Sequence, residues 1–224
     1  MNRNLTEIYQ TYVALSLDKQ LHIADLIGDL DWQFDMASRL LSLGHRFCWR
    51  AQILGTESES SRTWLWSWAN EASNIPENLL QASLTIKAFG EQHEIPELTA
   101  PEVPLDEIDG HSLAMIASGV CRANAYYRAP YDVGAAYLLI MDESFPRNTD
   151  EPLSRIATVF PQAIAALEIP NHRLAFLAYL ASYGILGRSD GNRVLVDGSN
   201  KPAMTAIFDE QNRLIRLLTA AQPA

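Results

Sequence analysis

The residues best suited to chemistry in this 224-residue chain cluster near its middle. They combine phenols, a guanidinium and a carboxylate, and they are Tyr126, Tyr127, Arg128, Tyr131 and Asp132. Pro130 predicts a stiff loop there, because its ring fixes its own φ and restricts the residue before it. In one interpretation these side chains and His111 line a polar pocket. In the other, Arg128 pairs with Asp132 and only holds a helix-to-strand turn.

A second group of polar residues lies just before a predicted helix. Three carboxylates and an imidazole fall within Asp106–His111. Such oxygen and nitrogen ligands suit a divalent cation, but their spacing matches no metal motif. Acidic residues before a helix are also favoured by its N-terminal dipole. We therefore predict no metal site and no cofactor.

The two cysteines offer little chemistry. Cys48 and Cys121 lie far apart, and neither has a second cysteine near it in the sequence. A metal knuckle or a redox pair needs such a neighbour, so two buried, reduced thiols are predicted. We also expect no G-x-S-x-G nucleophile motif, no phosphate loop and no dinucleotide fingerprint. The catalytic residues, if the protein is an enzyme, are left unassigned.

The element that must position these side chains is a tryptophan-rich hairpin at residues 46–70. Phe47, Trp49, Ala51 and Ile53 share one parity in its first arm, and Trp64, Trp66 and Trp68 share one in its second. This period of two is typical of strands with one buried face, so one largely aromatic face is predicted. That face forms either the core, with at least two second-arm tryptophans buried, or a stacking platform for a flat ligand.

Hydrophobic periodicity predicts further elements around this hairpin. The predicted helices cover residues 4–15 and 18–28, or one helix broken near Ser16, and then 74–89, 112–127, 153–167 and 173–183. Asn171 is the predicted N-terminal cap of the last of these helices. The predicted strands cover residues 38–43, 134–141, 192–196, 203–208 and 214–218, and the apolar run at 134–141 has a helix end as its alternative. A solvated turn is predicted at 55–61, an irregular connection at 91–105 and a further turn at 197–202. The chain is therefore predicted to be a single α+β domain, residues 1–224, in which antiparallel β meanders pack against several amphipathic helices.

Several short motifs together resemble a known group of proteins. They are FD at 34–35, QILGTES at 52–58, TWLWSWAN at 63–70, DGH at 109–111 and YYRAPYD at 126–132. In combination they resemble an uncharacterised bacterial family, one of the domains of unknown function. The resemblance implies a single bacterial cytoplasmic domain over most of the chain. It supplies no activity, cofactor or catalytic residue.

Charge restricts the partners that the protein can have. The formal net charge is −10 and the isoelectric point is near 4.9. Nucleic-acid phosphates and anionic membranes both require a basic surface, so neither is predicted as a partner. A basic protein or a small ligand is the expected partner. No apolar run approaches the length of a membrane span, and a cytoplasmic location is expected.

Two classes of function follow from these observations. The first is a non-enzymatic binding or interaction protein with an acidic surface, of which an immunity protein or inhibitor that neutralises a basic partner is one version. The alternative is a small hydrolase or transferase that uses a polar pocket around His111 and Tyr126–Asp132.

Overall fold

A computed structural model describes residues 3–198 and 202–220. The chain divides into two compact units, of which unit 1 comprises residues 1–9 and 19–147, and unit 2 comprises residues 10–18 and 148–224. The expectation of a single domain over residues 1–224 stays a prediction. Among the helices in the described ranges, none combines the length and the hydropathy needed to cross a bilayer.

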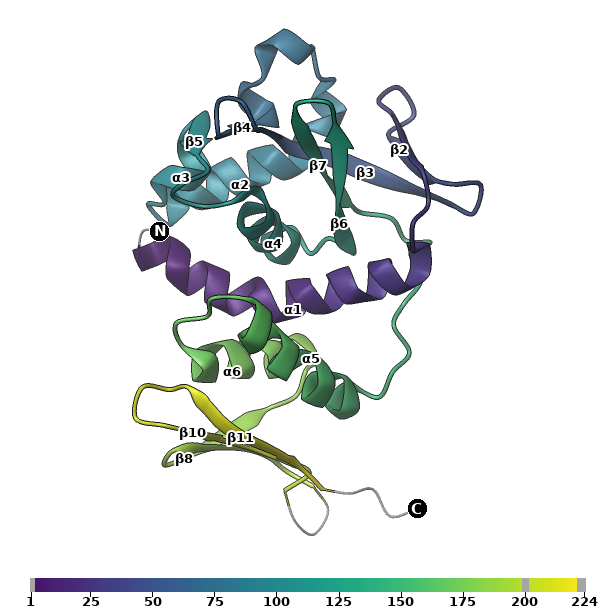
Figure 1. The fold of residues 1–224 in the computed structure, drawn as a ribbon. Coiled ribbons are helices and arrows are strands. Elements are labelled where there is room, and N and C mark those ends of the chain that lie inside the picture. Colours follow the sequence, from purple (N-terminus) through teal and green to yellow (C-terminus); the bar gives the residue numbers. More distant parts are fainter. Residues whose placement is uncertain (1–2, 199–201, 221–224) are drawn as a thin grey trace. The chain divides into compact units, whose positions relative to one another are not determined.

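The N-terminal segment forms one helix rather than two. Helix α1 spans Arg3–Ile27 without a break (Figure 1). Of the two alternatives predicted for this segment, two helices or one helix broken near Ser16, neither is correct. Ser16 is fully buried inside α1, where serine has only a small propensity penalty against a continuous helix.

Unit 1 is built on an antiparallel sheet of seven strands (Figure 1). The strands are β1 (Trp32–Asp35), β2 (Leu40–Leu43), β3 (Phe47–Ser58), β4 (Thr63–Trp66), β5 (Glu102–Pro104), β6 (Ala125–Tyr131) and β7 (Gly134–Ile140). Strands β1 to β5 follow one another in order, β7 also pairs with β3, and β6 pairs with β7. The predicted α+β class with antiparallel meanders is therefore confirmed.

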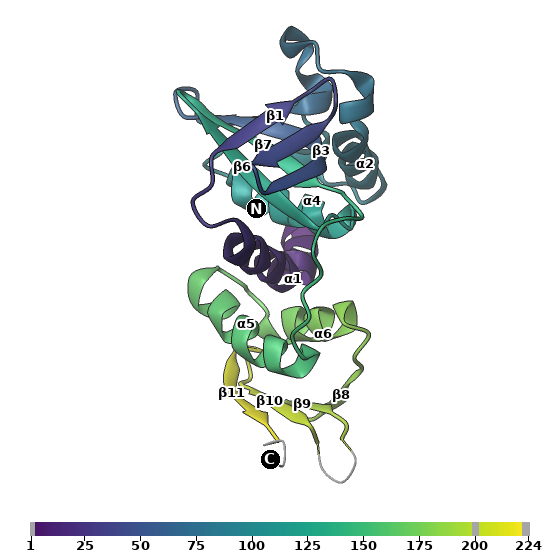
Figure 2. The same cartoon turned by 90° about the vertical axis from the view of Figure 1, so that its right-hand side faces the viewer.

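The helices of unit 1 begin and end away from several predicted boundaries. They are α2 (Gln81–Gln92), α3 (Pro96–Thr99) and α4 (Gly110–Val120), with short 3-10 turns at Ser67–Ala69, Glu71–Ser73 and Glu77–Leu79. Figure 2 shows α2 and α4 beside the strands of the sheet. The helix predicted from residue 74 starts only at 81, because Asn74 adopts a left-handed φ of 43° and ends a 3-10 turn. The segment predicted as an irregular connection contains α3 and β5, and the helix predicted to reach residue 127 ends at Val120.

A β-bulge corrects the predicted aromatic face. The register of β3 against β7 shifts between Ile53 and Gly55, so Leu54 is an extra residue. Ile53 pairs with Leu138, whereas Gly55 pairs with Tyr137 on the opposite face of β7. Gly55 also pairs with Trp66 on β4. The tryptophans of the two arms therefore lie on opposite faces of the sheet, since directly paired residues share a face.

Both faces of this sheet are packed with aromatic side chains. Trp64 and Trp66 are fully buried, which confirms that at least two second-arm tryptophans are core residues, and Trp66 Nε1 donates to the Glu97 carbonyl at 3.1 Å. On the other face Trp49 lies 4.7 Å from Phe145, centroid to centroid. Strand alternation exposes Cys48 beside Trp49, so the predicted burial of this cysteine is wrong.

Unit 2 contains two helices and a four-stranded antiparallel sheet. Its elements are α5 (Pro152–Ala166), α6 (His172–Ser182), β8 (Gly187–Asp190), β9 (Arg193–Val196), β10 (Met204–Phe208) and β11 (Leu214–Thr219), with strand order β11-β10-β9-β8. The predicted cap is confirmed, because the Asn171 side chain accepts from the Leu174 N–H at 2.9 Å. Strand β8 was not predicted, since its sequence GRSD has no apolar alternation. The predicted turn at 197–202 includes residues 199–201, which lie outside the described residues.

Candidate functional site

A cluster of polar side chains lies on the face of the unit 1 sheet that α4 covers. We call it the Glu57 cluster, and its members are Glu57, His111, Tyr126, Arg128 and Tyr137. The strand register brings it together, because Arg128 on β6 pairs with Tyr137 on β7, and Tyr137 pairs with Gly55 on β3. Glu57 lies two residues beyond Gly55 and therefore on the same face.

The carboxylate of Glu57 is the centre of this cluster. Its Oε1 accepts from Arg128 Nε at 2.8 Å and lies 2.5 Å from Arg128 Nη2, while its Oε2 accepts from Tyr137 Oη at 2.9 Å. The side chain of Glu57 is only 13% exposed. Burial is the main cause that raises the pKa of Tyr137, and the hydrogen bond to Glu57 adds to it, so Tyr137 remains a donor. The guanidinium of Arg128 is thus committed to an internal partner.

His111 occupies the exposed margin of the cluster at the start of α4. Its Nδ1 lies 2.9 Å from Tyr126 Oη, and its ring packs edge-on against Tyr137 at 5.4 Å. Burial raises the pKa of Tyr126, and the charge of Asp109 adds to the effect. The Tyr126 phenol therefore stays protonated, and its contact with Nδ1 orients the imidazole ring.

The DGH motif has a structural role at this point. The Asp109 side chain caps α4 by accepting from the Ser112 N–H at 2.7 Å. At Gly110 a Cβ atom would lie 2.6 Å from Glu57 Oε2 and 2.9 Å from Tyr137 Cζ, so a side chain would displace the cluster. His111 then supplies the bond to Tyr126. Asp106, at the other end of the candidate metal group, pairs with Arg62.

The structure brings together three of the six predicted pocket residues: His111, Tyr126 and Arg128. Tyr131 reaches the cluster only marginally, with its hydroxyl 3.4 Å from the backbone oxygen of Glu57. Tyr127 points to the opposite face, where its ring lies 6.4 Å from Trp32, and Asp132 is exposed in the turn after β6.

Two expectations about this region are wrong. The proposed pair of Arg128 with Asp132 does not form, because Arg128 extends across the sheet to Glu57. The segment predicted as a loop is strand β6, which pairs with β7 alone among the strands of residues 3–198 and 202–220. Pro130 is compatible with a strand at this position because proline is accepted at sheet edges, where its missing N–H costs no hydrogen bond.

Sequence reasoning missed Glu57 and Tyr137. Glu57 falls in the predicted solvated turn at 55–61, whereas β3 continues to Ser58 and places it against the sheet. A buried guanidinium requires an acidic partner, which was the available signal. The chain has 27 acidic residues, and this signal does not say which of them is the partner of Arg128. The alternation of β3 does not reveal it either, because the bulge after Ile53 changes the face on which Glu57 lies.

The expectation that the chain has no G-x-S-x-G motif is wrong. Residues 187–191 read GRSDG and match the G-x-S-x-G pattern of serine hydrolases. In that enzyme class the serine lies at a sharp strand-to-helix turn. Ser189 instead lies within β8, which pairs with β9 through a turn at Gly191. The motif therefore lacks the structural context that would give it a nucleophile.

Unit 2 contains its own buried carboxylate, far from these residues in sequence. Asp18 accepts from Arg155 Nε at 2.6 Å, from Tyr179 Oη at 2.7 Å and from Tyr183 Oη at 2.5 Å. Its side chain is 6% exposed. Burial raises the pKa values of both tyrosines, and the Asp18 charge adds to it. This group is a second internally paired cluster.

The buried phenols predict a loss of stability at alkaline pH. Tyr126, Tyr137, Tyr179 and Tyr183 all have folded-state pKa values above the unfolded value of about 10. Their contribution is complete below about pH 10 and is lost as the pH rises, because only the unfolded chain then releases these protons. Urea unfolding at a series of pH values should show a falling midpoint above about pH 10, and a shallower fall in Tyr137→Phe. A midpoint that stays constant to pH 11 would contradict this account.

Comparison with known proteins gives a family match over more than half of the chain. The sequence model of a family described as a family of unknown function (DUF6882) matches residues 6–143. No curated protein matches the chain. No solved structure matches it either.

Proposed function

We propose that this chain, which belongs to DUF6882, a family of unknown function, is a non-enzymatic binding protein that recognises a basic protein partner. An immunity protein or inhibitor that neutralises a basic target is the concrete version. The proposal places it in the bacterial cytoplasm, a reducing compartment that suits its two free cysteines.

One observation carries the proposal. Residues 91–109, which we call the acidic segment, contain seven carboxylates and no lysine or arginine. Six of these acidic residues are exposed: Glu91, Glu94, Glu102, Asp106, Glu107 and Asp109. Unit 1 as a whole has 19 acidic and 10 basic residues, so it carries nearly all of the net charge of −10. A surface of this kind attracts and orients a basic partner.

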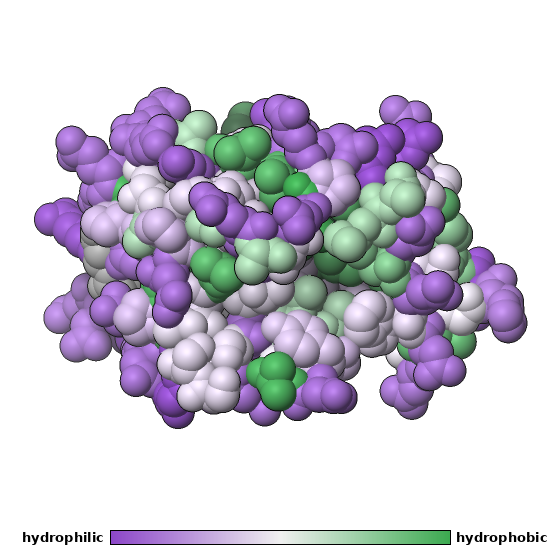
Figure 3. Space-filling model, turned by 90° about the horizontal axis from the view of Figure 1, so that it is seen from above, coloured by the Kyte–Doolittle hydropathy of each residue, from purple (hydrophilic) through white to green (hydrophobic). Residues whose placement is uncertain are grey.

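The surface of unit 1 agrees with a binding role. In Figure 3 hydrophilic side chains dominate the outline of one face, and hydrophobic surface is visible between them. A polar rim around apolar surface is the usual composition of a protein interface. Exposed large hydrophobic residues of unit 1 are Met36, Leu84, Tyr131, Val133 and Met141.

The Glu57 cluster supports binding over catalysis. The Glu57 carboxylate already accepts from Arg128 and Tyr137. Neither this carboxylate nor the Arg128 guanidinium is therefore available to a substrate. A catalytic pair normally leaves one group free to exchange a proton with the reacting molecule. The cluster instead fixes α4 on the sheet, and α4 begins directly after the acidic segment.

Association with the partner should depend strongly on salt. The partner is the protein that the chain captures from a lysate, and its association rate should fall by at least about 10-fold as salt rises from about 0.01 M to 1 M, because screening shortens the range of charge attraction. Stopped-flow or surface-binding kinetics measure this rate. A rate independent of salt would show that the acidic segment does not steer association, and would remove the main support for the proposal.

The alternative function is a small hydrolase or transferase. It is favoured by His111, an exposed imidazole whose Nδ1 is held by a buried phenol 2.9 Å away while Nε2 is left for another group. This is the arrangement of an oriented general base. The neighbours of His111 described above include no nucleophile. The binding function is therefore better supported than the hydrolase or transferase.

A further inference from the structure

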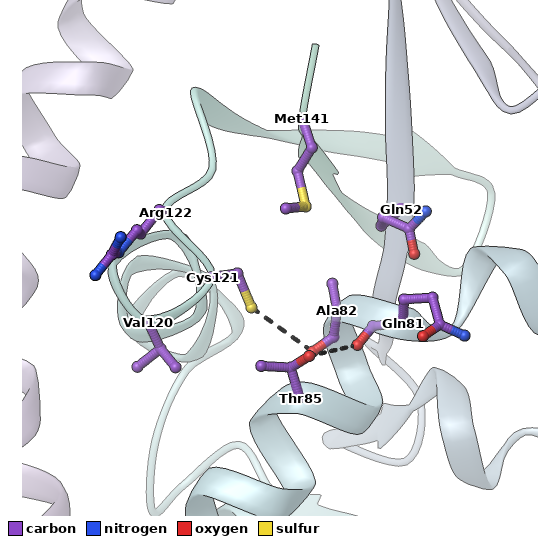
Figure 4. A pocket seen from close by; sticks show the side chains of 8 residues that line it. All are labelled: Gln52, Gln81, Ala82, Thr85, Val120, Cys121, Arg122 and Met141. Carbon is purple, nitrogen blue, oxygen red and sulfur yellow. Dashed lines mark hydrogen bonds between the residues drawn. The ribbon is translucent and has the colours of Figure 1, made fainter. Parts of the chain in front are cut away.

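A cavity of about 360 Å³ lies in unit 1, and no residue of the Glu57 cluster lines it (Figure 4). Strand β3, helix α2, the end of helix α4 and the residue after β7 form its walls. The lining residues are Gln52, Gln81, Ala82, Thr85, Val120, Cys121, Arg122 and Met141. The cavity is therefore separate from the polar cluster and from the acidic segment.

Seven of the eight residues that line this cavity are uncharged, and two of them contain sulfur. The sulfur atoms of Cys121 and Met141 both face the space between the helices, while the guanidinium of Arg122 is directed away from it (Figure 4). Burial raises the pKa of Cys121 to about 11, so its thiol is neutral, and it donates weakly to the Ala82 carbonyl at 3.7 Å. Polarisable sulfur atoms of this kind make favourable contacts with aromatic rings.

One buried polar atom beside the cavity lacks a hydrogen-bond partner among the described residues. The Gln52 side chain donates from Nε2 to the Asn78 carbonyl at 3.0 Å. Its Oε1 is shielded from solvent and has no hydrogen-bond partner among the described residues. A shielded acceptor without a donor is destabilising, and a donor that enters the adjacent cavity would relieve this.

We propose that this cavity binds an uncharged aromatic molecule of about two fused rings that carries one N–H or O–H donor. The size follows from volume, because a cavity of about 150 Å³ holds a single benzene ring. The cavity disfavours a charged molecule, since the one charged group of its lining, the Arg122 guanidinium, is directed away from it and a charge taken from water would find no counter-charge inside. The donor would meet Gln52, and the ring would contact Cys121 and Met141.

Indole is the probe that fits this description, and 1-methylindole is its matched partner without the donor. Indole should bind with a dissociation constant of about 1 mM or lower, measured by saturation-transfer NMR or calorimetry. The affinity of 1-methylindole should be lower by about 3- to 10-fold, which is the usual value of one hydrogen bond. Indole-3-acetate, an anion, should bind more weakly than either.

Variants locate the binding site. Thr85→Phe and Gln81→Trp add bulk at exposed lining positions and should each abolish indole binding, whereas Ala88→Phe adds the same bulk at an exposed position of α2 that does not line the cavity. In a Cys48→Ser background, indole should also slow alkylation of Cys121. No binding of indole at about 10 mM, or unchanged binding in both filled variants, would overturn the proposal. Equal affinity for indole and 1-methylindole would overturn the role of Gln52.

Discussion

Replacing Trp66 by alanine is expected to lower the free energy of unfolding by about 3 to 5 kcal/mol. The side chain is fully buried between strands and helices of unit 1, and its Nε1–H bonds to the Glu97 carbonyl. Alanine removes the aromatic contacts, leaves a cavity and deprives that carbonyl of its donor. Urea unfolding followed by circular dichroism measures the change.

Trp68→Ala is the matched control for this experiment. Trp68 has the same parity in the sequence, but it is partly exposed and lies under Lys87, whose Nζ is 4.3 Å from the ring centroid. The loss there should be about 1 kcal/mol, the scale of an exposed cation-π contact. If Trp66→Ala also lowers the free energy of unfolding by less than about 1 kcal/mol, Trp66 is not a core residue. The stacking platform would then be restored as the function of the tryptophan arm.

The second large effect is expected at Arg128. Arg128→Ala leaves Glu57 buried without its cation and should destabilise the protein by about 2 to 4 kcal/mol, somewhat below the value for a fully buried pair because Arg128 is 32% exposed. Arg122→Ala, at an exposed arginine that forms none of the ion pairs found in residues 3–198 and 202–220, should change stability by less than about 0.5 kcal/mol.

A paired substitution separates a structural role from a binding role for Arg128. Arg128→Met with Glu57→Leu removes both charges, so stability should recover to within about 1 kcal/mol of wild type. Partner binding should also persist in this double variant if the cluster only supports the fold. A single Arg128→Ala variant that unfolds like wild type yet loses partner binding would assign Arg128 to the interface instead.

The sequence was informative where hydrophobic patterns were regular. Period-two alternation located β3 and β4, the continuous apolar run at 134–141 located β7, and the capping residue Asn171 located the start of α6. Such patterns report the burial of an element, on one face where they alternate and on both faces where they are continuous. The α+β class followed from them.

The errors arose where tertiary contacts decide the structure. The single extra residue Leu54 moves Gly55 and Glu57 to the other face of the sheet, and no local signal marks that bulge. Strand β8 is exposed and forms through pairing with β9, so its own sequence carries no pattern. The partner of Arg128 lies 71 residues away, and only the folded register brings it near.

The binding proposal is tested most directly by comparing two neutralised variants with wild type in the association measurement at low salt. Glu94→Gln, Glu102→Gln and Glu107→Gln together remove three exposed charges from the acidic segment, while Glu71→Gln, Glu77→Gln and Glu143→Gln remove three exposed charges elsewhere in unit 1. His111→Ala removes the imidazole on which the enzymatic alternative depends. We predict that the first variant associates at least about 10-fold more slowly with the captured partner, and that the second variant and His111→Ala stay close to wild type. Equal rates for the two neutralised variants, together with loss of binding in His111→Ala, would contradict the proposal and favour the site around His111.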